Sequence, residues 1–149
     1  MKPTLIMLSL TQSRGQFTAI NTQDLRHIRV FPREEKAIVV TSQATLTLKC
    51  MTESRLKRLV KDIRDRYNVI HLPGTGAEAP NKENNTIVAI DHGDSSTTYV
   101  WPKAMFCVAK RGGQLHIYGF KLKCAVDIPV HVDFTPETFT RFDGFVRKD

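Results

Sequence analysis

Three basic side chains with the spacing of one helix flank form the clearest chemical pattern in the sequence. Lys57, Lys61 and Arg64 are separated by four and three positions, and Arg55 falls on the other flank. Such spacing places side chains in a row along an α-helix. A row of cations can neutralise successive phosphates of a nucleic-acid backbone and release counterions, which gives affinity independent of base sequence. We therefore expect this helix surface to contact nucleic acid.

A second group of basic residues precedes the predicted helix and enlarges the candidate binding surface. Taken together, the residues expected to contact phosphate are Arg26, Arg29, Arg33, Lys36, Arg55, Lys57, Lys61 and Arg64. The other interpretation of the helix is an ordinary solvated face. Asp65 lies four positions after Lys61, and Asp62 lies four positions from basic residues on either side, so local ion pairs offset part of the charge.

The net charge of the chain is concentrated in its first half. Residues 1–72 contain 13 Lys and Arg against 6 Asp and Glu, whereas residues 73–149 contain 9 of each, so the formal net charge of +7 belongs to the first half. An excess of this kind attracts polyanions. We expect a small binding or regulatory protein whose partner is DNA or RNA. The same charges also suit an acidic protein surface, and the alternative is therefore a protein-interaction module such as an inhibitor or adaptor.

Two fragments of the sequence have the residue types of an enzyme site. Asp91, His92, Asp94 and Ser95 gather carboxylates, an imidazole and a hydroxyl, which suits acid–base chemistry but is also ordinary turn composition. No further catalytic motif accompanies them. We therefore expect binding in preference to catalysis, and assign no catalytic residue, metal ligand or cofactor.

The second fragment is Asp24 followed by Glu34 and Lys36, a spacing that resembles the PD-(D/E)xK nucleases. In that family the carboxylates hold Mg²⁺ and the lysine stabilises charge. Glu34 and Lys36 fall beside Pro32, however, where the family has a strand. A metal-dependent nuclease, or another small enzyme, is the second alternative.

The length and composition are ordinary for one compact globular domain, or for two small domains that share a core. The chain has 149 residues, of which 41% are hydrophobic and 25% are charged. No apolar stretch approaches the roughly 18–20 residues that span a bilayer, and no signal peptide is recognisable at the start. The three cysteines, Cys50, Cys107 and Cys124, form no close pair, which suits a reducing compartment. We expect a cytoplasmic protein with no membrane partner.

Hydrophobic periodicity predicts strands followed by a helix before residue 72. Residues 4–10 and 16–20 alternate around a turn, as do residues 36–41 and 45–49. From Thr52 the apolar residues follow the period of a helix, and Thr52 or Ser54 suits the cap at its start.

The same order recurs after a polar, Pro- and Gly-containing segment at residues 73–85. Strands are predicted over residues 86–91, 97–101, 105–110, 114–120 and 126–134, followed by a helix capped by Thr135. The predicted fold class is α+β, with antiparallel sheet and two amphipathic helices in two similar strands-then-helix units. The predicted organisation is a basic unit over residues 1–72, a linker or long loop over 73–85 and a neutral unit over 86–149, either separate or around one shared core.

Overall fold

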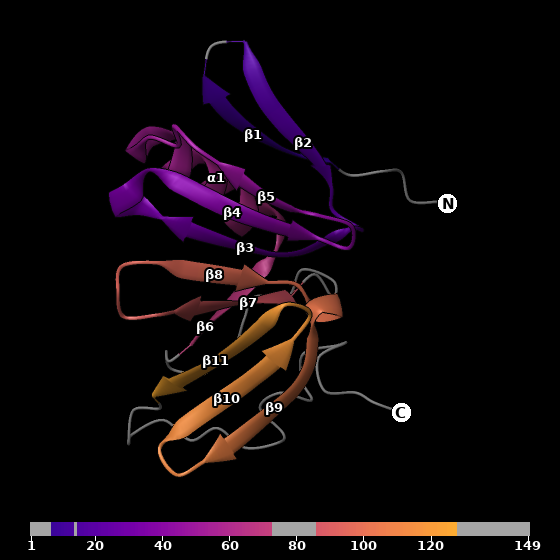
Figure 1. Cartoon of the computed structure of the whole chain (residues 1–149), viewed down its shortest axis with the longest axis vertical. Coiled ribbons are helices and arrows are strands. Elements are labelled where there is room, and N and C mark those ends of the chain that lie inside the picture. The colour runs from indigo at the N-terminus through magenta and orange to yellow at the C-terminus, as the bar shows by residue number, and fades with distance from the viewer. Residues whose placement is uncertain (1–6, 14, 73–85, 128–149) are drawn as a thin grey trace.

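A six-stranded sheet at the centre of the molecule takes strands from both halves of the sequence (Figure 1). The computed structural model describes residues 7–13, 15–72 and 86–127. In chain order the elements are β1 (Met7–Ser13), β2 (Gln16–Asn21), β3 (Leu25–Phe31), the 3₁₀ turn η1 (Pro32–Glu34), β4 (Lys36–Thr41), β5 (Thr45–Leu48), α1 (Glu53–Arg66), β6 (Asn68–Leu72), β7 (Thr86–Asp91), β8 (Thr97–Val100), the 3₁₀ turn η2 (Pro102–Ala104), β9 (Met105–Arg111), β10 (Gln114–Gly119) and β11 (Leu122–Asp127).

The strands of the large sheet follow the order β5-β4-β3-β8-β7-β6. All neighbours are antiparallel except β6 and β7, which are parallel. Two smaller antiparallel sheets complete the molecule, the hairpin β1–β2 and the meander β9–β10–β11, which lie at opposite ends in Figure 1. The pairing of β3 with β8 joins the two halves of the chain in one sheet.

Side chains that alternate along the strands form two cores, one on each face of the large sheet. Ile87 of β7 is buried in the core that α1 covers, whereas the adjacent Val88 is buried in the core that the meander covers. The residues that the large sheet contributes to the second core come only from β6, β7 and β8, namely Leu72, Val88, Ile90 and Val100. The meander therefore packs on the β6-β7-β8 half of that face. Among the described residues, it does not pack its core residues on the β3-β4-β5 half.

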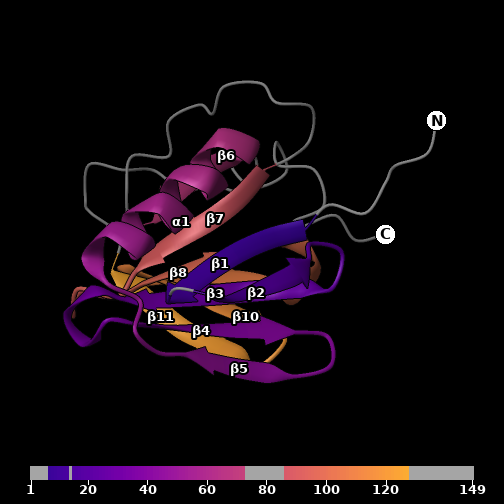
Figure 2. The ribbon, with the colours of Figure 1, turned by 90° about the horizontal axis from the view of Figure 1, so that it is seen from above.

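The predicted helix after Thr52 is confirmed as α1. Its N-cap is Thr52, whose hydroxyl oxygen accepts the backbone N–H of Arg55 at 3.4 Å. Leu56, Leu59 and Ile63 form its buried stripe, as the periodicity predicted. Seen from above, α1 lies over the large sheet, next to β1 (Figure 2).

The predicted fold class is wrong in its architecture. The large sheet is mixed, and β8 and β7 of the second half lie between β3 and β6 of the first half, so there are not two similar strands-then-helix units. Within residues 7–13, 15–72 and 86–127, α1 is the one α-helix. Periodicity reports which face of a segment is buried but not its distant partner, which is why the repeat was misjudged. The helix predicted from Thr135 and the segment 73–85 lie outside the described residues.

Most predicted strands are confirmed within a residue or two. The β4–β5 hairpin occurs where alternation predicted it and β7 to β10 match four further predicted strands, whereas β1 of the β1–β2 hairpin ends at Ser13, three residues beyond the prediction. Two differences remain. The strand predicted to start at Val126 starts at Leu122, with residues beyond Asp127 outside the described part, and β6 was not predicted.

Candidate functional site

A cavity of about 430 Å³ lies between the β3-β4-β5 half of the sheet and the turn that leads into β11. Alternation along β3 brings His27, Arg29 and Phe31 to this face, and Ile38 of β4 adds an apolar side chain. Residues 121–124 form the opposite wall. We call this cavity the basic groove.

Cations from both halves of the chain meet at the basic groove. Arg29 lines one wall, and the exposed side chains of Lys121 and Lys123 line the other. Lys36 stands beside it, because its Nζ lies 4.9 Å from the ring centroid of Phe31, and Arg29 Cζ lies 4.8 Å from the same centroid. The ring of Phe31 therefore holds two cations near each other at the groove.

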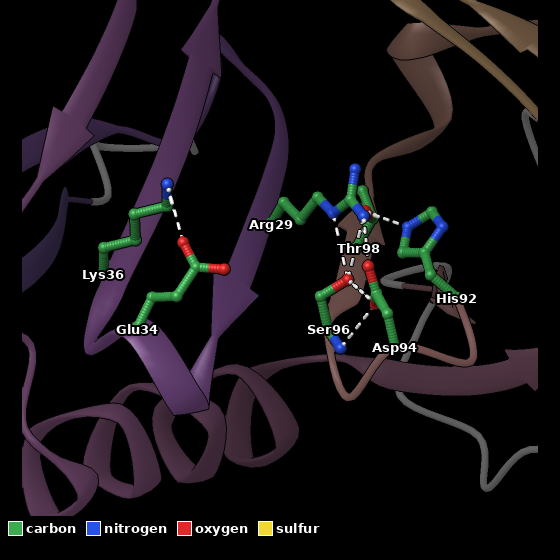
Figure 3. A network of polar contacts seen from close by, with 7 residues as sticks. All are labelled: Arg29, Glu34, Lys36, His92, Asp94, Ser96 and Thr98. Atoms are coloured by element: carbon green, nitrogen blue, oxygen red, sulfur yellow. Dashed lines mark hydrogen bonds and ion pairs between the residues drawn. The ribbon is translucent and has the colours of Figure 1, made fainter.

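Arg29 is fixed by the turn between β7 and β8 (Figure 3). Its Nε and Nη2 donate to Ser96 Oγ at 3.1 and 2.9 Å, and Nη2 donates to Asp94 Oδ2 at 3.3 Å. Ser96 Oγ donates in turn to Asp94 Oδ1 at 2.5 Å, and the Ser96 backbone N–H donates to the same oxygen at 2.9 Å. The guanidinium is thus held in one orientation at the groove by a buried serine.

Carboxylates offset part of the positive charge. The hydrogen bonds from the Ser96 hydroxyl and backbone, and then the charge of Arg29, lower the pKa of Asp94, so this group stays ionised at neutral pH. Lys36 pairs with Glu34 at 3.0 Å. Four cations at or beside the groove are therefore accompanied by two carboxylates, and the unbalanced charge comes from Lys121 and Lys123.

Two histidines at the groove are neutral at pH 7. His27 Nε2 donates to the Phe120 carbonyl at 3.1 Å, and His92 Nε2 shares a hydrogen bond of 2.6 Å with Thr98 Oγ1. Burial lowers the pKa of both imidazoles, and the charge of Arg29 adds to the effect at His92. They contribute hydrogen bonds to the groove but no charge at this pH.

The carboxylates and the imidazole at residues 91–95 that suited acid–base chemistry in the sequence make hydrogen bonds within and next to the β7–β8 turn. Asp91 Oδ1 accepts the Thr97 hydroxyl at 2.9 Å, and Asp94 is engaged by Ser96 and Arg29. Among the described residues, this turn contains no chain of hydrogen bonds from hydroxyl to imidazole to carboxylate, the arrangement that activates a nucleophile.

The residues that resemble a nuclease motif are separated by the length of a strand. Asp24 precedes β3 and accepts the Ser42 hydroxyl at 3.4 Å, whereas Glu34 follows β3 and pairs with Lys36. A seven-residue strand extends roughly 20 Å, so the two carboxylates cannot share one ion. In the described part of the chain, no three His, Cys, Asp or Glu side chains lie close enough to hold a metal.

The basic residues of α1 lie on the other side of the large sheet from the groove. Lys57 pairs with Glu53 at 3.2 Å and Lys61 with Asp65 at 2.9 Å, both as exposed i,i+4 pairs. The other two helix residues that were predicted to bind contact protein groups: Arg55 Nη1 donates to the Cys50 carbonyl at 2.8 Å, and Arg64 Nη2 lies 3.2 Å from His71 Nε2. The structure thus divides the predicted basic set between two faces.

Arg26 and Arg33 join neither the groove wall nor the helix surface. Arg26 Nη1 donates to the carbonyls of Gln23 at 3.2 Å and Leu25 at 3.4 Å. Arg33 is exposed in η1, three positions before Lys36, and is not among the cavity-lining residues.

Sequence reasoning missed Lys121 and Lys123 because they belong to the half with no net charge. No strand alternation in the sequence places them together, because Lys121 lies in the turn before β11 with a positive φ of 53° and only Lys123 belongs to the strand. Cys124, which is half-buried, completes this wall, whereas Cys50 and Cys107 are exposed elsewhere.

Comparison of the chain with protein-family models, with curated proteins and with solved structures finds no match. Within the described residues, no helix has the length and apolar character to cross a bilayer. The geometry of the groove therefore carries the functional argument by itself.

Proposed function

We propose that the protein binds nucleic acid by contacting the phosphate backbone in the basic groove. The observation that carries this proposal is the convergence of Arg29, Lys121 and Lys123, from segments about ninety positions apart, on one cavity. Lys and Arg side chains that meet in a groove neutralise phosphates and release counterions.

The shape of the site favours a nucleic-acid strand over an acidic protein. A concave groove admits a narrow chain of phosphates, with the cations on both walls within reach of it. Arg29 suits phosphate because its guanidinium donates through several N–H groups in a fixed plane. Ser96 and Asp94 hold that plane in place before the ligand arrives, and a phosphate oxygen competes with Asp94 for the same donors.

The test compares two variants that each remove two lysines. Lys121→Ala with Lys123→Ala removes the groove charge, and Lys57→Ala with Lys61→Ala removes the same charge from α1. Binding to a short labelled single-stranded DNA, followed by fluorescence anisotropy over a range of salt concentrations, should weaken about tenfold or more in the groove variant. The slope of log K against log salt should fall by about 1.4, the contribution of two phosphate contacts to a single strand.

The helix variant serves as the matched control and should bind nearly as well as the unchanged protein. Equally weakened DNA binding in both variants would mean that the net charge of the protein, and not the groove, determines affinity. Weakening of the helix variant alone would assign it to α1. Absence of binding to DNA and RNA at low salt, with binding to polyglutamate retained, would favour the acidic-protein alternative.

A further inference from the structure

A second cavity, of about 590 Å³, lies where α1 ends, apart from the basic groove. Its lining includes the aromatic side chains of Tyr67 and Trp101 together with Leu25 and Pro102. The two rings meet edge to face, with centroids 5.4 Å apart and an interplanar angle of 86°. This volume is in the range of sites for small molecules, and aromatic walls are typical of them.

The walls of this cavity are held by backbone hydrogen bonds. The Trp101 N–H donates to the Arg26 carbonyl at 3.0 Å, and the Trp101 carbonyl accepts the Ala104 N–H at 2.9 Å. In the turn between β2 and β3, the side-chain Oδ1 of Asn21 accepts the N–H of Gln23, another lining residue, at 2.9 Å. The cavity is therefore preformed.

Trp101 carries an unused donor. Its side chain is only 6% exposed, and its Nε1 has no hydrogen-bond partner among the described residues. Buried indole N–H groups nearly always find an acceptor, because an unmet donor costs free energy. The donor is enclosed beside the cavity, where its NMR resonance reports on a ligand held against the ring of Trp101.

The lining of this cavity is also positively charged. Arg66, at the end of α1, and Lys103, in η2, both line it, and no described lining residue is acidic. Lys103 Nζ donates to the Gln23 carbonyl at 3.4 Å, a long bond that a charged acceptor readily replaces.

We propose that this cavity binds a small planar aromatic anion, with the ring against Tyr67 and Trp101 and the anionic group between Arg66 and Lys103. Nucleoside monophosphates and aromatic carboxylates share this chemistry. The site is separate from the basic groove, so its occupancy does not depend on the function proposed for the groove.

The chain contains one tryptophan, so Trp101 reports on the site without interference. The experiment titrates the full chain with adenosine 5′-monophosphate and with benzoate, following tryptophan fluorescence and the single indole N–H resonance in a ¹⁵N NMR spectrum. A saturable change with one or both is expected, and the probe that binds more tightly identifies the source. Adenosine and inorganic phosphate, which each supply half of the chemistry, should bind more weakly by about tenfold or more.

Lys103→Ala should weaken binding of the anionic probe by about tenfold and leave binding of adenosine unchanged. The matched control is Lys49→Ala, which removes an exposed lysine outside the cavity and should change nothing. Far-UV circular dichroism shows whether each variant remains folded. Unaltered fluorescence and an unmoved indole resonance with all four probes would overturn the proposal, as would equal affinities of Lys103→Ala and Lys49→Ala.

Discussion

Arg29 in the basic groove is hydrogen-bonded to the turn between β7 and β8 through the buried hydroxyl of Ser96. The sequence alone named Arg29 as a candidate because of its charge, but its partners Ser96 and Asp94 lie more than sixty positions away. Charge is visible in a sequence, whereas the contact that orients it depends on the pairing of β3 with β8. For this reason the residue was predictable and the site was not.

Histidine burial makes the stability of the protein depend on pH. Burial lowers the pKa of His27, His71 and His92 from the ordinary value of 6.5. The unfolded chain therefore binds more protons below pH 6.5, and the free energy of unfolding should fall as the pH drops from about 6.5 towards 5 and stay level above it. Urea unfolding at a series of pH values measures this.

His27→Gln is the variant that assigns the effect. Glutamine keeps an N–H for the Phe120 carbonyl but does not titrate, so the decline in stability towards pH 5 should become shallower. Asp94 does not affect the measurement in this pH range, because its pKa is lowered from 3.8. Its contribution to the free energy of unfolding is lost only at lower pH. Stability that rises between pH 6.5 and 5 would contradict the assignment.

At the scale of elements, local patterns were sufficient for hairpins and helix but not for β6. Alternation and a short turn specify β4 and β5 together, and the cap at Thr52 with its apolar stripe specifies α1. β6 has five residues directly after α1, and its parallel partner β7 begins fourteen positions after it ends. Nothing local distinguishes such a strand from the start of a loop.

Gly119, at the end of β10, is required by close packing. A Cβ at this position would lie 2.0 Å from the Ala104 carbonyl oxygen, which also accepts the Phe120 N–H at 2.7 Å. Gly119→Ala should therefore lower the free energy of unfolding by at least about 2 kcal/mol, since backbone must move. Chemical denaturation measures the change.

Gly113→Ala is the control for this substitution. Gly113 has no heavy atom within 4 Å of the corresponding Cβ position, so its replacement should change the free energy of unfolding by less than about 1 kcal/mol. Equal effects at the two glycines would show that loss of backbone freedom, not the Ala104 contact, governs them.

At the scale of the whole molecule, the two halves of the sequence complete one another. The core under α1 contains Leu59 and Ile63 from the first half and Ile87, Tyr99 and Trp101 from the second. The charge asymmetry in the sequence therefore does not correspond to two independent bodies in the structure. The groove itself takes Arg29 from one half and Lys121 with Lys123 from the other.

A fragment of residues 1–72 should consequently fail to fold alone. It retains α1 and β3 but lacks β8 and β7, the partners of β3 and β6, and so loses much of its buried apolar surface. Circular dichroism and the dispersion of proton NMR signals should show a largely unfolded chain. Cooperative thermal unfolding of this fragment would mean that the first half is an autonomous domain.

The positions of the three cysteines allow the protein to be footprinted chemically without any engineering. Cys124 lies in the wall of the basic groove, where burial raises the pKa of its thiol and slows alkylation, whereas Cys50 and Cys107 are exposed away from it. Mass spectrometry of the alkylated protein reads all three thiols in one sample. A polyanion bound in the groove should slow the alkylation of Cys124 alone. The alkylation rates of Cys50 and Cys107 should stay unchanged and serve as internal controls.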